Sequence, residues 1–417
     1  MTDLLLRNAR VTGRDAPVDI AVGDGRIVAI GAADAAGHDA RETVDCAGDA
    51  VIPGLIEPHL HLDKALLDAE KPNVDGTLAG AVEVTRELKR GFTGEGVRAR
   101  AAQVLEQAVV HGTTAIRAHA DVDPVVGLLG LEVLLGLRES HADLVDLQVV
   151  AFPQEGILQS PGTKDLLVEC LRAGADVVGG CSYMESTPEE CRDHVDRVFA
   201  LAERFGVPVD LHADFADDTS DPRYALAGYI ADRTRAHGMA GRVTVGHMTS
   251  LASLGADARK RTIADLADAG VAVVVLPATD VHLGGRSDDA NVRRGIAPVR
   301  DLLDAGVRTG LSSNNIRNGF TPFGNADVLE IALFLAQTAH LGGPDDLATL
   351  IRMATDDAAR ILGIGDGYGL HVGAVADLVL LAAPTATDAL LDRAHRRAVI
   401  KRGRVVATTE HTTRVYR

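Results

Sequence analysis

The chain has 417 residues, of which 46% are hydrophobic and 24% charged, and its formal net charge is −17. This composition is typical of a globular protein long enough for more than one domain. The strong negative charge argues against nucleic acid and membrane surfaces as partners, and no apolar run is long enough to span a bilayer. Met1-Thr2-Asp3 lacks the features of a secretory signal, and the four cysteines show no metal-site or redox spacing, so we expect a cytoplasmic location.

Both ends of the chain predict β-strands. Asp24-Gly25 is a two-residue hairpin signal near the N-terminus, and Arg402-Gly403 is a turn signal near the C-terminus. The predicted strands are Leu4–Val11, Val18–Val22, Arg26–Ile30, Asp377–Leu381 and Ala398–Thr408. We therefore expect one small β-sandwich that is built from both termini, residues 1–53 and 366–417.

Between these ends, apolar strand candidates alternate with helical stretches such as Gly96–His111, and several helices end at a glycine that precedes a strand. The strand candidates are Leu55–His61, Thr113–His119, Leu147–Gln154, Ala175–Cys181, Val207–His212, Val243–His247, Val271–Pro277 and Arg308–Asn314. Eight such strands predict a (β/α)₈ barrel over residues 54–365. The alternative, a doubly wound open sheet, is disfavoured because no dinucleotide-type glycine motif follows the first strand.

The stretch Ile52–Lys64 carries the clearest chemical signal. It is an apolar strand that ends in His59 and His61, and residues two apart in a strand point to the same side. More polar residues follow the other predicted strands, at the end where barrel enzymes place their working side chains. These residues are His119, Gln154, His212, Asp214, His247, Asp280, His282 and Asn314. We expect His59, His61 and His212 to bind a divalent metal with one position open, so that bound water ionises near neutral pH.

Several longer segments carry the motifs of one known family. They are Pro58–Asp63, Val150–Leu158, Asp210–Asp214, Val243–His247, His282–Arg286, Asn315–Arg317, Pro322–Gly324, Ala358–Ile364, Gly373 and Ala376–Leu380. Together they resemble the amidohydrolase superfamily, and within it the subgroup of cytosine deaminase and N-isopropylammelide aminohydrolase. The resemblance covers essentially the whole chain. The loop His282–Arg286 is similar to one in cytosine deaminase, and Pro322–Gly324 is similar to the triazine enzyme.

The resemblance implies one divalent metal ion, zinc or iron with manganese as a further choice, and a small heterocyclic substrate. His247 would hydrogen-bond the attacking water, and Gln154 would offer its amide to a carbonyl and a ring nitrogen of the substrate. His282, Asn315 and Phe320 are expected to contact the substrate as well. Members of the superfamily often associate, so we also expect a homo-oligomer.

Two positions depart from the family pattern. The strand-eight aspartate, which ligates the metal and takes a proton from water, is replaced here by Asn314. The glutamate three residues after the strand-five histidine, which carries protons to the ring, is replaced by Phe215. The Asn314 amide is expected to coordinate the metal weakly through its oxygen. Neither an amide nor a phenyl ring can accept a proton near neutral pH, and such a catalyst contributes about 10²–10⁴-fold in rate. Phe215 would also make the substrate pocket more apolar.

Three hypotheses are compatible with these replacements. In the first, the chain hydrolyses a C–N bond of a nitrogen heterocycle, and the proton carrier has moved to Asp280, His247 or Asp214. In the second, the same scaffold catalyses a non-hydrolytic step, and in the third it is a ligand-binding protein without catalysis. Asp214 has a structural alternative, which is to orient the neighbouring His212. Asp63 and Lys64 are expected at the rim, as an ion pair without a chemical role.

Overall fold

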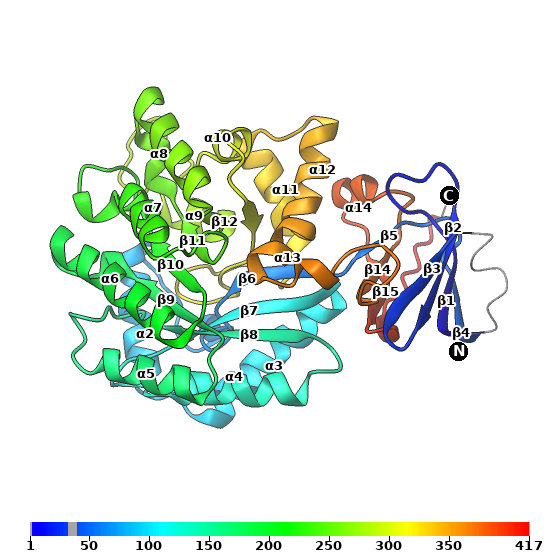
Figure 1. The fold of residues 1–417 in the computed structure, drawn as a ribbon, viewed down its shortest axis with the longest axis horizontal. Coiled ribbons are helices and arrows are strands. Elements are labelled where there is room, and N and C mark those ends of the chain that lie inside the picture. Colours follow the sequence, from blue (N-terminus) through cyan, green and yellow to red (C-terminus); the bar gives the residue numbers. More distant parts are fainter. Residues whose placement is uncertain (1, 32–39, 417) are drawn as a thin grey trace.

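The computed structural model describes residues 2–31 and 40–416. A large barrel and a smaller β-domain lie side by side, with both described ends of the chain in the smaller one (Figure 1). The barrel sheet has the order β13-β12-β11-β10-β9-β8-β7-β6, and every pair in it is parallel. Its strands are β6 (Leu55–Leu60), β7 (Thr113–Asp121), β8 (Asp146–Phe152), β9 (Val177–Cys181), β10 (Val209–Ala213), β11 (Val243–His247), β12 (Ala272–Val275) and β13 (Thr309–Leu311). The eight predicted strands are confirmed.

The first and last strands of the sheet close the barrel. Leu60 forms a parallel bridge with Asn314, and the His61 amide donates to the Asn314 carbonyl at 2.9 Å. Behind this seam, the buried Glu57 carboxylate accepts from the Ser313 amide at 2.9 Å and from the Ser312 hydroxyl. The closure therefore places Asn314 beside the paired histidines of β6.

Helices follow the strands and cover the barrel from outside (Figure 1). The sequence sets their ends: the Thr187 hydroxyl caps α6 at its first turn, and Gly206, with a φ of 70°, ends it in the left-handed conformation. The helices are α2 (Leu78–Lys89), α3 (Gly94–Val110), α4 (Leu129–Ser140), α5 (Thr163–Ala173), α6 (Pro188–Phe205), α7 (Ala227–Ala236), α8 (Ala256–Ala269), α9 (Pro277–Leu283), α10 (Val299–Asp304), α11 (Val328–Ala339), α12 (Pro344–Met353), α13 (Asp356–Leu362) and α14 (Ala386–Asp392). None of the helices in the described ranges has the length and hydrophobicity of a membrane span.

The smaller domain consists of two four-stranded sheets. One has the order β3-β2-β1-β4 and the other β16-β15-β14-β5, so each end of the chain supplies strands. Their strands are β1 (Thr2–Ala9), β2 (Val18–Gly23), β3 (Arg26–Ile30), β4 (Ala40–Asp45), β5 (Val51–Pro53), β14 (Leu378–Leu381), β15 (Arg396–Lys401) and β16 (Arg404–Thr408). Leu4 and Ile20 of one sheet share a buried apolar core with Leu380 and Ile400 of the other. The predicted β-sandwich from both termini is confirmed, whereas the exact boundaries at residues 53 and 365 stay a prediction.

The stretch Ile52–Lys64 is divided between the two domains. Residues Val51–Pro53 pair with β14 in the sandwich, and β6 begins at Leu55 in the barrel. Gly54 lies at the junction. A larger residue would not fit there, because its Cβ atom would lie 2.1 Å from the Thr114 hydroxyl oxygen. At this glycine the chain leaves one sheet and enters the other, and the predicted barrel strand Leu55–His61 begins directly after it.

Candidate metal centre and active site

Three imidazoles converge at the C-terminal end of the barrel. His59 lies one residue before the end of β6, His61 directly follows the strand, and His212 lies on β10. The His212 Nε2 lies 3.0 Å from the Nε2 of His59 and 3.1 Å from the Nε2 of His61. All three side chains are buried, and burial is the main cause that holds their pKa values well below the usual range. Neutral imidazoles that point their Nε2 atoms at one another form a typical set of metal donors.

Asn314 adds an oxygen to the same place. It lines the chamber that contains His61 and His212, and its backbone is held in the left-handed conformation, with a φ of 61°. Its Oδ1 atom is buried and has no hydrogen-bond partner in the described part of the chain. A buried acceptor without a partner is costly unless a ligand satisfies it. The donor set therefore fits a divalent cation held by three nitrogens and one amide oxygen.

A second buried layer supports the imidazoles from below. Asp210 lies 3.3 Å from the His119 Nε2, and its other oxygen accepts from Arg117 at 3.0 Å. The Asp210 carboxylate also lies 3.7 Å from the His59 Nδ1. His119 and His59 therefore lie beside the same buried carboxylate, that of Asp210.

His247 and Asp280 form a tight pair beside the donors. The His247 Nδ1 lies 2.6 Å from an Asp280 carboxylate oxygen, and both residues are buried. Burial raises the pKa of Asp280, and the contact with His247 offsets part of that rise. The Phe215 ring stacks on the His247 imidazole with centroids 4.1 Å apart. The pair is an imidazole oriented by a carboxylate, the arrangement used for proton transfer.

The Asp214 carboxylate binds backbone amides outside the chamber. Its two carboxylate oxygens accept from the amides of Leu226 and Ala227, at 2.8 and 3.0 Å, at the start of α7. Burial raises its pKa to about 6. Since both oxygens bind the helix N-terminus, the structure favours a role in holding α7 over the predicted role as proton carrier.

Lys64 does not lie at the rim, so the expected surface ion pair with Asp63 was wrong. Lys64 is 1% exposed and lines the chamber. Its ammonium donates to Asp121 at 2.7 Å and to the Gln154 side-chain oxygen at 2.8 Å. Asp63 instead accepts from the Asp121 amide at 2.7 Å. Sequence reasoning had named this cation but placed it at the rim, although its position three residues after His61 was a signal for the chamber.

The chamber around these groups is small, about 10 Å³. Predicted substrate contacts Gln154, Phe215, Asn315 and Phe320 line it, and so do Tyr183 and Thr279, which the sequence did not single out. His282 does not line the chamber. It lies on α9 beside Arg286 and faces a separate cavity. A volume of this size holds about one water molecule, so the chamber in this state is smaller than a heterocycle.

A buried carboxylate anchors the loop that carries Gln154. Glu185 accepts from the amides of Ile157 at 2.7 Å and of Leu158 and Gln159 at 3.1 Å. It also pairs with the His194 Nδ1 at 2.7 Å. These bonds fix the loop after β8, so Gln154 is presented on a rigid support.

A model of the amidohydrolase family matches residues 73–407. The chain belongs to the amidohydrolase family. By family it is therefore a hydrolase of carbon–nitrogen bonds other than peptide bonds, from a metal-dependent group, and the predicted enzyme class is confirmed.

Three relatives show how far the likeness extends. N-isopropylammelide isopropyl amidohydrolase of Pseudomonas sp. (strain ADP) is 30% identical over 413 residues, 98% of this chain and 98% of that protein. Pterin deaminase of Rhizobium rhizogenes is 32% identical over 391 residues, 93% of this chain and 87% of that protein. The structure of 5-methylcytosine deaminase from Klebsiella pneumoniae, liganded with phosphonocytosine, superposes with a TM-score of 0.93 at 32% identity, covering 99% of this chain and 100% of that one.

Proposed function

We propose that this amidohydrolase hydrolyses a C–N bond of a small, planar nitrogen heterocycle, by deamination, dealkylamination or ring-amide cleavage. The observation that carries the proposal is the convergence of the Nε2 atoms of His59, His61 and His212 beside the His247–Asp280 pair. The names of the relatives support the substrate class, since they act on an ammelide, a pterin and a methylcytosine.

His59, His61, His212 and the Asn314 amide oxygen would hold one divalent ion, zinc or iron with manganese as a further choice. When bound, such an ion supplies a Lewis acid that lowers the pKa of a water molecule. Neutral imidazoles leave the charge of the ion uncompensated, because Asn314 contributes no negative charge where the family has a carboxylate. The site is therefore more positive than one with an aspartate.

Proton transfer falls to His247 in this proposal. Its Nδ1 faces the Asp280 carboxylate, so Nδ1 carries the hydrogen and Nε2 is left as the acceptor. From there His247 would take a proton from the attacking water and give it to the leaving nitrogen. Asp280 keeps the imidazole in this tautomer and stabilises it once it is charged.

The remaining chamber residues would bind the ring. Gln154 and Lys64 lie 2.8 Å apart and together present N–H donors to a substrate carbonyl. Phe215 and Phe320 provide apolar walls for a planar ring. Because a phenyl ring replaces the glutamate at position 215, the site favours a substituent that is bulkier than a bare amine.

Two replacements support a different candidate, a metal-binding protein of this scaffold that binds heterocycles without hydrolysing them. Asn314 and Phe215 remove both carboxylates that the deaminase mechanism uses. In that case the His247–Asp280 pair would have only a structural role. Turnover therefore decides between the two candidates.

The first experiment measures metal content by elemental analysis on protein purified without chelators. We expect about one zinc, iron or manganese ion per chain, and loss of that ion in His61→Ala. His282→Ala is the matched control, since that imidazole lies outside the chamber and should leave the metal content unchanged. Absence of metal even after reconstitution would overturn the proposed centre.

The second experiment tests the proton carrier on a panel of heterocyclic amines and amides. Asp280→Asn should lower kcat by about 10²–10⁴-fold without loss of metal. Activity should fall as the pH drops through the pKa of Asp280, which burial raises above that of an ordinary aspartate. The variant should lose this acid limb. Unchanged turnover in Asp280→Asn would remove the pair from the mechanism, and no turnover of any heterocycle by the wild type would favour the binding protein.

A further inference from the structure

A second cavity, of about 670 Å³, lies behind α9. Ala278, Val281 and His282 line it, and their spacing of three and four residues places them on one face of the helix. Thr279 of the same helix lines the metal chamber instead. The helix is therefore a wall between the two spaces, and it also carries Asp280, which binds His247.

Two sequence motifs that the metal chamber does not use meet at this cavity. Residues 282 and 284–286 of the loop His282–Arg286 line it, and so do Phe323 and Gly324 of Pro322–Gly324. None of these residues lines the metal chamber. The volume lies within the range of about 300–1,000 Å³ that small-molecule sites occupy. The cavity is thus large enough for a two-ring molecule, whereas the chamber in this state is not.

The walls combine aromatic rings with unpaired charges. Phe323 is 62% exposed, and its ring stands nearly perpendicular to the His282 imidazole, at a centroid distance of 5.7 Å. Arg393, at the C-terminal end of α14, and Glu330, in the first turn of α11, line the cavity, and their side chains have no ion-pair partner in the described ranges. Arg286 donates to the His282 carbonyl at 2.8 Å and likewise contacts no carboxylate there. These three exposed side chains could therefore bind an anion and a hydrogen-bond donor without breaking an ion pair.

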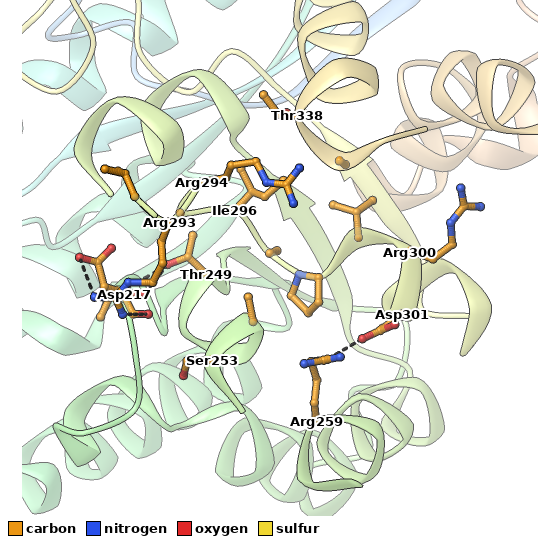
Figure 2. Close-up of a pocket in the computed structure, with 18 of the residues that line it drawn as sticks. Asp217, Thr249, Ser253, Arg259, Arg293, Arg294, Ile296, Arg300, Asp301 and Thr338 are labelled. Carbon is orange, nitrogen blue, oxygen red and sulfur yellow. Dashed lines mark hydrogen bonds and ion pairs between the residues drawn. The ribbon is translucent and has the colours of Figure 1, made fainter. Parts of the chain in front are cut away.

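Another cavity, of about 540 Å³, serves as a comparison, because its charged side chains already have partners (Figure 2). Its arginines are already paired with carboxylates, Arg259 with Asp301 at 2.5 Å and Arg300 with Asp346 at 2.7 Å. Arg293 contacts Asp288 at 2.8 Å, and Arg294 donates to the imidazole of His340 at 2.6 Å. A ligand there would have to replace existing partners, so its arginines do not indicate an anion site.

We propose that the cavity behind α9 is a second small-molecule site, which binds a planar aromatic anion that also carries an N–H group. The ring would lie against Phe323 and His282, the anion would bind Arg393 and Arg286, and the N–H would donate to Glu330. This site goes beyond the proposed hydrolysis, because it shares no lining residue with the metal chamber. Its occupant would contact the helix that holds Asp280 against His247, so it is suited to be an effector of the reaction.

A pair of fluorescent probes tests the chemistry. 8-Anilinonaphthalene-1-sulfonate has two aromatic units, an anionic group and an N–H, and N-phenyl-1-naphthylamine is the same molecule without the anion. We expect the sulfonate to bind the wild-type full chain saturably, with one site, and more tightly than the neutral amine. Arg393→Met should weaken the sulfonate about tenfold, the loss of one charge-assisted hydrogen bond, and leave the neutral amine unchanged. Phe323→Ala should weaken both probes.

Matched variants and a second readout separate this site from unspecific adsorption. Arg404→Met removes an exposed arginine of β16, and Tyr416→Ala removes an aromatic side chain that is 85% exposed; neither should change binding of either probe. Hydrogen–deuterium exchange should show that the sulfonate slows exchange in α9, whatever the metal content of the sample. Equal binding to the wild type, Arg393→Met and Phe323→Ala would overturn the proposal. The proposal would also be overturned if Phe323→Ala changed the oligomeric state and left probe binding intact. That result would mean that the surface contacts a second copy of the chain.

Discussion

The two sides of the metal chamber differ in how closely they follow the family pattern. The metal side has its three imidazoles from β6 and β10, with the Nε2 atoms 3.0 and 3.1 Å apart. The proton side has Asn314 and Phe215 at the two positions where the resemblance implies carboxylates. In the proposed mechanism Asn314 would still hold the metal through its amide oxygen, whereas proton transfer would rest on His247 and Asp280.

The proton side nevertheless retains a carboxylate. Asp280 reaches the chamber indirectly, through the 2.6 Å contact with His247, and Phe215 covers one face of that imidazole. A base buried under an aromatic ring is protected from bulk water, which strengthens its electrostatic interaction with Asp280. If the two family carboxylates are absent, the His247–Asp280 pair would still give the site a path for protons.

The largest expected effect comes from restoring the family residues on the proton side. Asn314→Asp combined with Phe215→Glu should raise the release of ammonia from cytosine or a related amine by about 10²–10⁴-fold, because each position regains a proton acceptor. Ammonia release under saturating substrate measures this. The single variants serve as controls, and each should gain less than the double variant, since both groups act on one proton path.

The same double variant can also break the comparison. Suppose that the double variant binds metal normally but releases no more ammonia from any heterocycle than the wild type does. Restoring the two carboxylates would then not be enough to restore deamination. The ancestry of the site would then have to be a reaction other than deamination.

A second effect concerns the buried cation on the metal side. Lys64→Met should destabilise the chain by about 3–5 kcal/mol, because it leaves the Asp121 carboxylate buried without its 2.7 Å partner. Denaturant unfolding of the metal-free protein measures this. Adding Asp121→Asn to the same chain removes the unpaired charge and should restore most of the lost stability. If it restores none, packing of the lysine stem rather than the ion pair carries the cost.

The sequence predicted what depends on local periodicity. Apolar runs that alternate with helical stretches located all eight barrel strands, and the spacing of His59 and His61 placed both imidazoles on one side. Lys64 was predicted at the wrong place because a polar residue directly after a strand resembles a rim residue. Its partner Asp121 lies at the end of β7, and the sequence does not show that this strand end is adjacent to Lys64. His282 was expected in the substrate pocket, but the segment after β12 is the helix α9, and His282 lines the cavity behind this helix whereas Thr279 lines the metal chamber.

Asp214 was misjudged for a related reason. It lies two residues beyond the ligand His212, so its position along the chain predicted a catalytic role. The amides that it binds belong to residues 226 and 227, at the start of a helix whose return path the sequence did not show. The orientation of the Asp214 side chain is therefore set by its contacts with a segment that follows later in the chain, and not by its position after a strand.

The smallest expected effect tests this structural role. Asp214→Ala should destabilise the chain by about 0.5–2 kcal/mol, the usual cost of a lost helix cap, with an added cost because its φ of 54° disfavours alanine. Asp214→Asn is the matched variant, since asparagine tolerates this backbone conformation and keeps an acceptor oxygen, so it should cost less. Denaturant unfolding gives both values, and metal content and turnover should stay at the wild-type level in the asparagine variant. A loss of turnover as large as that in Asp280→Asn would return Asp214 to the proton side, because an uncharged cap can hold α7 but cannot carry a proton.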